Sequence, residues 1–193
     1  MQSYLYVVHT RPLLRRAGER LAKQGRRQLA ALYLRKADEE NGHEQWVLGD
    51  LRAIGVNPDI VRHAKPAPGV AAYIAWNSFT VDHGSPVAFL GTAYVLESGG
   101  ASRAGTIAKN VVAHSGIRGI ERGVFFLEGH ADADIDHVAQ LGQLIDAYAS
   151  SDTDCRDLVL SAWVARSTYI GLLTAVAAEA AERHDAIATT CAA

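Results

Sequence analysis

Residues 130–145 read HADADIDHVAQLGQLI, and this stretch decides how the rest of the chain is interpreted. On an α-helix each residue advances by about 100°, so His130, Asp134 and His137 share one face. The apolar residues that follow recur at helical spacing on a neighbouring stripe, namely Val138, Leu141, Leu144 and Ile145. Two imidazoles and a carboxylate on an inward helix face are suited to a divalent transition metal, iron above all.

The same stretch also allows a second interpretation, a solvated acidic face. Asp132 and Asp136 lie among the candidate ligands, and acidic residues are common in the first turns of helices because they complement the helix dipole. Taken alone, the stretch leaves both interpretations open.

The composition favours one helical domain over residues 1–193. The chain is 49% apolar with only 5 prolines, which suits a bundle better than a sheet, and its length allows a substantial core. A formal net charge of −2 indicates no basic surface for nucleic acid. Cys155 and Cys191 are far apart and match no zinc or redox spacing, so we expect a reduced, cytoplasmic protein.

No targeting or membrane segment is expected. The apolar residues 4–8 lack a preceding basic region and a cleavage site of small residues, so we predict no signal peptide. No apolar run reaches the length that spans a bilayer, and no membrane partner is expected.

Apolar spacing, glycines and prolines predict the helices. We expect a long second helix that is unbroken to Ile54, and an interruption of the fourth helix at Ser98-Gly99-Gly100. We expect the tail from about residue 185 to be frayed. The predicted helices cover residues 3–23, 27–54, 69–81, 86–116, 125–148 and 151–184.

The apolar residues of two of these helices are expected to be buried. They are Ala72, Ile74, Ala75 and Phe79 in the third helix, and Leu158, Val159, Ala162, Trp163, Ala165, Ile170, Leu173 and Val176 in the last.

The second predicted helix carries another set of candidate ligands. Glu40 and His43 are three residues apart and therefore neighbours on one face, with Lys36 one turn earlier. A charged outer face with Glu–Lys pairs is the usual interpretation of such a run. It does not explain why the pair is followed by Trp46 and Val47, which should lie inside.

Glu97 completes the set, because a lone carboxylate after an apolar run is costly unless it is paired or bound to metal. Helix bundles that hold two irons use repeated carboxylate-x-x-His pairs together with further carboxylates. We therefore predict a dinuclear site. Its predicted ligands come from three helices and are Glu40, His43, Glu97, His130, Asp134 and His137.

Two residues are candidates for a direct role in catalysis. Glu97 would lie between or beside the two irons. Lys36 could pair with a substrate carboxylate, although an ion pair with Glu39 or Glu40 is an equally good interpretation.

The quoted motifs resemble a known family. Glu39-Glu40-Asn-Gly-His43-Glu-Gln-Trp46, Tyr94-Val-Leu-Glu97 and His130-x3-Asp134-x2-His137 are similar to the heme-oxygenase-like iron-containing redox enzymes, also called heme-oxygenase-like diiron oxidases. The resemblance implies an all-α heme-oxygenase-like (TenA-like) bundle without bound heme. It further implies two non-heme irons, O2 as co-substrate, and oxidation of a small organic acid, a fatty acid or an amine.

The resemblance carries the metal-ligand roles to the six residues above. Some members of the family place the first carboxylate one turn earlier, where this chain has Lys36. If the protein follows that subgroup, one iron lacks a ligand, and a mononuclear or labile site is expected instead.

Two other functions stay open. Tyr94-Val-Leu-Glu97-Ser-Gly-Gly also resembles the distal helix of bacterial heme oxygenases, with His9 as the candidate axial ligand of a heme-degrading enzyme. The other alternative is a cofactor-free protein similar to the TenA and PqqC relatives. The oligomeric state is open, and a homodimer is one candidate because it is the commonest oligomer.

Overall fold

The computed structural model describes the backbone of residues 1–191 and the side chains of residues 1–131 and 136–178. In this part every regular element is helical, as expected for an all-α fold. The α-helices are α1 Gln2–Lys23, α2 Arg27–Glu39, α3 His43–Ala53, α4 Pro58–Arg62, α5 Pro68–Asp82, α6 Phe89–Gly99, α7 Gly105–His114, α8 Phe125–Tyr148 and α9 Asp152–Cys191. Two short 3₁₀-helical turns form η1 Pro86–Ala88 and η3 Ile120–Arg122, and a π-helical turn forms η2 Gly100–Ala104.

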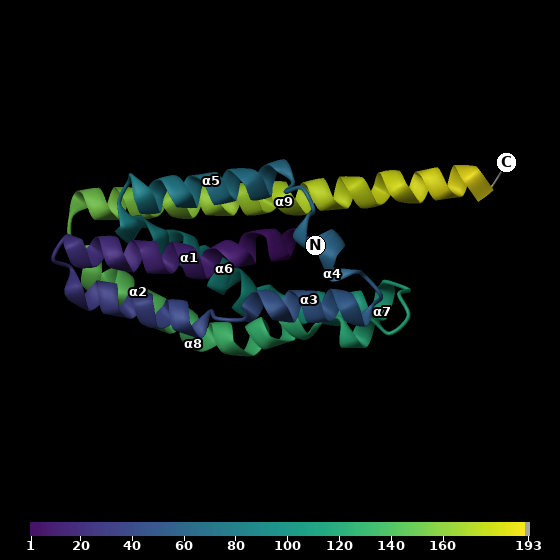
Figure 1. Cartoon of the computed structure of the whole chain (residues 1–193), viewed down its shortest axis with the longest axis horizontal. Helices are drawn as coiled ribbons and strands as arrows, with labels where there is room; N and C mark the ends of the chain where they lie inside the picture. Colours follow the sequence, from purple (N-terminus) through teal and green to yellow (C-terminus); the bar gives the residue numbers. More distant parts are fainter. Residues whose placement is uncertain (192–193) are drawn as a thin grey trace.

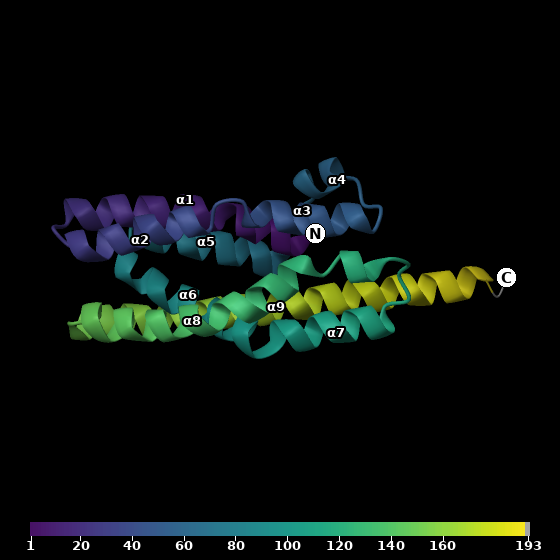
Figure 2. The ribbon, with the colours of Figure 1, turned by 90° about the horizontal axis from the view of Figure 1, so that it is seen from below.

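The helices pack in two layers. Figure 2 shows α1, α2, α3 and α5 in one layer, α7, α8 and α9 in the other, and α6 crossing between them. The layers are joined by contacts of α6 with α8 and α9, of α5 with α9 and of α3 with α8. In Figure 1 the C-terminal part of α9 extends beyond the body of the bundle.

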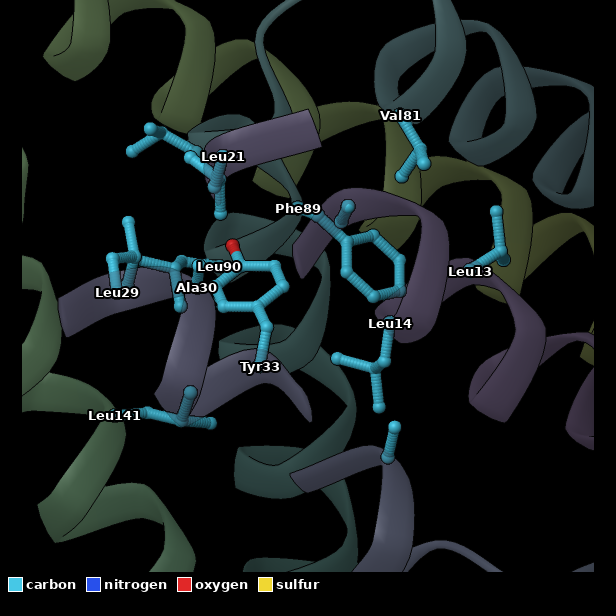
Figure 3. Close-up of a cluster of buried hydrophobic side chains, with 13 residues drawn as sticks. Leu13, Leu14, Leu21, Leu29, Ala30, Tyr33, Val81, Phe89, Leu90 and Leu141 are labelled. Carbon is cyan, nitrogen blue, oxygen red and sulfur yellow. The ribbon is translucent and has the colours of Figure 1, made fainter. Parts of the chain in front are cut away.

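The main core lies between α1, α2, α6 and α8 (Figure 3). Leu13, Leu21 and Leu29 are almost completely buried there, and Leu141 of α8 closes one side. Burying leucine side chains of this kind stabilises the fold by about 1.5–3 kcal/mol each. At the centre Tyr33 donates its hydroxyl to the carbonyl of Pro86 at 3.0 Å, so the phenol is buried without losing its hydrogen bond.

The prediction of one unbroken helix over 27–54 is wrong. The chain turns at Glu40–Gly42, and Gly42 adopts φ +94°, a left-handed conformation that favours glycine. The carbonyl of Gly42 accepts the N–H of Gln45 and starts α3. The consequence is that Glu40 is the C-cap residue just after α2, whereas His43 begins α3.

The expected interruption after Gly99 takes the form of a π-helical turn. Residues Gly100–Ala104 continue α6 into α7 with a wider backbone spiral. The Ser102 hydroxyl donates to the carbonyl of Ser98 at 2.6 Å, which helps to satisfy the backbone where the helical ladder changes. Turns of this kind are frequent at functional sites.

The burial expected for two helices is partly wrong. On α5 the buried residues include Tyr73 and Asn77, whereas Phe79 is 56% exposed. On α9 Ala165 is buried as predicted, but Trp163 is 62% exposed. The inward faces of α5 and α9 carry polar residues as well as apolar ones. Asn77 of α5 and Ser161 of α9 are both buried, and each forms a hydrogen bond with Thr92 of α6.

The last helix is longer than predicted, since α9 continues past His184 to Cys191. Fraying of this tail remains a prediction, because the side chains from 179 lie outside the described part. By length and composition alone, Asp152–Ala178 could also cross a membrane, contrary to the prediction that no apolar run is long enough. Its packing against α5 and α6 equally suits a bundle helix, so this is weak evidence for a membrane role.

Candidate metal centre

The first candidate pair is Glu40 and His43, which the turn at Gly42 holds together. Nδ1 of His43 lies 3.0 Å from Oε2 of Glu40, and the two side chains are 15% and 11% exposed. Burial works to raise the pKa of Glu40, but the contact with His43 and the ammonium of Lys36 outweigh it and keep that pKa below its usual value. The carboxylate is therefore charged at neutral pH.

The second pair is Glu97 of α6 and His137 of α8. Nδ1 of His137 lies 3.1 Å from Oε2 of Glu97, which is only 12% exposed. These residues are 40 positions apart in sequence, and the packing of α6 against α8 brings them together.

Lys36 lies between the two pairs. Its Nζ is 3.3 Å from Oε1 of Glu40, 3.2 Å from Oε1 of Glu97 and 3.1 Å from Nδ1 of His137. A longer contact of 3.8 Å reaches Glu39. Burial alone would lower the pKa of Lys36, but the carboxylates of Glu97 and Glu40 more than compensate and raise it, so the side chain is a cation.

His130 lies beside the first pair and is oriented by the backbone. Its Nδ1 lies 2.7 Å from the carbonyl oxygen of Phe126, so in the neutral ring Nδ1 carries the proton and Nε2 has the lone pair. Burial, together with nearby His43, lowers the pKa of His130 despite the opposing hydrogen bond. Its ring centroid is 5.2 Å from that of His43.

Aromatic packing holds the first pair and His130 in place. The ring of His43 stacks on Trp46 at 4.2 Å, and Trp46 meets Phe125 edge-on at 5.2 Å. Trp46 approaches α8 closely at Gly129, where a Cβ atom would lie 3.2 Å from the indole. The absence of a side chain at Gly129 thus lets α3 and α8 come close beside the candidate site.

The polar groups open onto an apolar cavity of about 210 Å³ that communicates with solvent. Glu40, Glu97, Lys36 and His130 lie on its wall. The remaining lining is mostly apolar or aromatic and includes Tyr6, Tyr73, Phe89, Leu96, Phe126, Tyr169 and Leu173. The cavity therefore suits an organic molecule with an apolar body.

Comparison with known proteins identifies the family. Residues 1–169 match the family model described as iron-containing redox enzyme. The chain belongs to the iron-containing redox enzyme family. No curated protein matches it. The chain is also similar to a crystal structure from Shewanella denitrificans OS217, described as a domain of unknown function with a heme oxygenase-like fold. The two structures superpose with a TM-score of 0.76 at 21% sequence identity, and the match covers 92% of this chain and 75% of the other.

The donor types fit what an iron-containing redox enzyme needs. Donor atoms of one first-row metal lie about 2 Å from it, so neighbouring donors are about 3 Å apart. Both Glu–His pairs have this spacing, at 3.0 and 3.1 Å. Nδ1 of His43 is moreover buried without a well-directed hydrogen bond. Carboxylates and imidazoles are the usual ligands of non-heme iron.

The predicted site is nevertheless not a closed set of ligands. Within the side chains described, three or more His, Cys, Asp or Glu residues do not gather in a metal-binding arrangement. Lys36 joins the two pairs instead. Asp134 is the sixth predicted ligand, and its side chain lies outside the described residues.

His9, the axial ligand of the heme alternative, does not face this cavity. Val7 and Thr10 of the same turn line it, whereas His9 is absent from the described lining residues. Gly99 and Gly100 do line the cavity. The position of His9 therefore does not favour heme binding.

Three residues near the site have roles that the sequence analysis did not assign. Asp50 anchors the start of α8, and Arg103 adds a second cation to the cavity wall. Tyr6 meets Tyr73 and Tyr169 edge-on at 5.7 and 6.1 Å. These contacts join residues far apart in sequence, so no local spacing could have revealed them.

Proposed function

We propose that this protein is a non-heme-iron oxidase or oxygenase that uses O2 to oxidise a small organic acid, a fatty acid or an amine. The observation that carries the proposal is that Glu40, Glu97 and His130 line an apolar cavity, and that each of the two carboxylates is paired with a histidine. Membership of an iron-containing redox family supports the same assignment.

Glu40, His43, Glu97, His130 and His137 would hold the metal, together with Asp134, in the two-iron form that the sequence motifs favour. Iron bound there would supply the electrons for the reduction of O2. His130 presents its Nε2 lone pair because the carbonyl of Phe126 orients the ring. Trp46 packs against the ring of His43 and would help to hold this ligand in place.

The chain also offers a group for the substrate. Arg103 lies on the wall of the same cavity. A substrate carboxylate would pair with Arg103, and its apolar body would pack against the aromatic lining. Lys36 is then not the substrate anchor, since Glu40 and Glu97 already hold its ammonium group.

The proposal is tested by loading the protein with Fe(II) without oxygen and measuring bound iron and O2 consumption with a panel of acids and amines. His130→Ala and Glu40→Gln should lose bound iron and O2 consumption, whereas His114→Ala, at an exposed histidine of α7, should retain both. Stoichiometric hemin binding with a Soret band would instead favour the heme alternative. Absence of bound iron under all conditions would favour the cofactor-free alternative.

A further inference from the structure

Lys36 contacts the two Glu–His pairs unequally. On the Glu97–His137 pair it touches both partners, at Oε1 and at Nδ1. On the Glu40–His43 pair it touches only Oε1 of Glu40, while Oε2 of the same carboxylate faces His43 at 3.0 Å. In both pairs Oε2 of the carboxylate faces the histidine, and Lys36 contacts Oε1. The difference is that the ammonium group also lies 3.1 Å from Nδ1 of His137, whereas it contacts the first pair through Glu40.

We propose that Lys36 makes the two metal positions unequal, so that a first divalent ion binds at Glu40, His43 and His130 and a second binds at Glu97 and His137 only when the ammonium group leaves. This inference rests on the proposed iron site. It deepens the proposal by assigning an order of metal binding and the residue that causes it.

The physical reason is the competition of two cations for the same oxygen and nitrogen atoms. Nζ lies within 3.2 Å of the Glu97 and His137 atoms that would bind an ion. An ion about 2 Å from those atoms would stand within a few ångströms of Nζ. A divalent ion and an ammonium group so close repel each other strongly in a partly buried site. Lys36 can remain during binding at the first position, because there its described contact is with Oε1 of Glu40 and not with an imidazole nitrogen.

The test is an anaerobic metal titration of the full chain with Co(II) and Fe(II), followed by spectroscopy and by the metal content after gel filtration. Wild type should bind one ion tightly and a second at least roughly tenfold more weakly, or not at all. Lys36→Met removes the charge and retains the length of the side chain. In this variant the second ion should bind roughly tenfold or more tightly than in wild type.

Two controls keep the result interpretable. Lys109→Met removes an exposed lysine of α7 and should leave both affinities unchanged. Lys36→Gln serves as a second neutral variant if Lys36→Met fails to fold, as judged by circular dichroism.

Two ions of equal affinity in wild type would overturn the inference and leave the proposed function standing. A second affinity that stays unchanged in both neutral variants would overturn it as well. If neither wild type nor variant binds metal, the inference and the proposed function both fail.

Discussion

The carboxylate of Asp50, on α3, accepts the backbone N–H groups of Phe126 at 2.8 Å and of Phe125 at 3.1 Å, at the first residues of α8. Asp50 is only 8% exposed. Free N–H groups at a helix start need acceptors, and a carboxylate also complements the helix dipole. Because α8 carries His130 and His137, this contact sets the position of two candidate ligands relative to α3.

Substitution of Asp50 is expected to destabilise the fold. Asp50→Asn retains one acceptor oxygen but loses the charge and one hydrogen bond, and should reduce the free energy of unfolding by about 1–2 kcal/mol in urea denaturation. Asp38→Asn, at an α2 carboxylate that is 67% exposed, should change it by less than about 0.5 kcal/mol. Equal effects of the two substitutions would contradict the anchoring role.

Gly91 allows α6 and α9 to come into contact. A Cβ atom at this position would lie 2.2 Å from the carbonyl oxygen of Leu158, a backbone atom that cannot move away by a rotamer change. Gly91→Ala should therefore destabilise the protein by about 1–3 kcal/mol in thermal or urea unfolding. Gly142→Ala, at a helical glycine of α8 whose Cβ would meet no atom within 4 Å, should be neutral or stabilising by up to about 1 kcal/mol.

A buried hydrogen-bond chain joins α5, α6 and α9. Trp76 donates to Ser161 at 3.2 Å, Ser161 and Thr92 are 3.0 Å apart, Thr92 donates to Asn77 at 2.8 Å, and Asn77 donates to the carbonyl of Tyr73. Removing the middle hydroxyl by Thr92→Val leaves the Asn77 oxygen without its donor. The variant should lose about 1–3 kcal/mol of stability in urea unfolding.

A double variant checks that this chain acts as a unit. Thr92→Val combined with Ser161→Ala should cost less than the sum of the single substitutions, because the second removes a partner that is already lost. Strict additivity would show that the two hydroxyls act independently.

His130 should make stability fall in mild acid. Burial lowers the pKa of its imidazole in the folded protein below the usual value of about 6.5. As the pH falls from about 6.5 through the folded pKa, the unfolded chain takes up the proton first, so the free energy of unfolding decreases. Above about pH 7 the ring is neutral in both states and this contribution is absent.

The measurement is urea unfolding at pH 7.5 and 5.5 in the presence of EDTA. His130→Gln should show a smaller loss of stability between these values than wild type does. His114→Gln, at an exposed histidine, should retain the wild-type difference. A wild-type loss that persists unchanged in His130→Gln would assign the acid sensitivity to another group.

Much of the site could be predicted locally, because helical spacing relates neighbouring residues. The contact between Glu40 and His43 was expected from their separation by three positions, and it survives although the helix breaks between them. The break itself was missed. Residues 38–45 carry no apolar side chain, so apolar periodicity cannot locate the break, and the structure shows it as a turn in which Gly42 has a positive φ.

The sequence by itself predicted that the chain is helical and which carboxylates and histidines are the candidate ligands. Those properties depend on residue type and on spacing within single segments. Only the tertiary structure decided that Lys36 stands between Glu40 and Glu97, that Asp50 anchors α8, and that Phe79 faces outward. These relations depend on how separate helices rotate and approach one another, which is set by packing across the whole bundle.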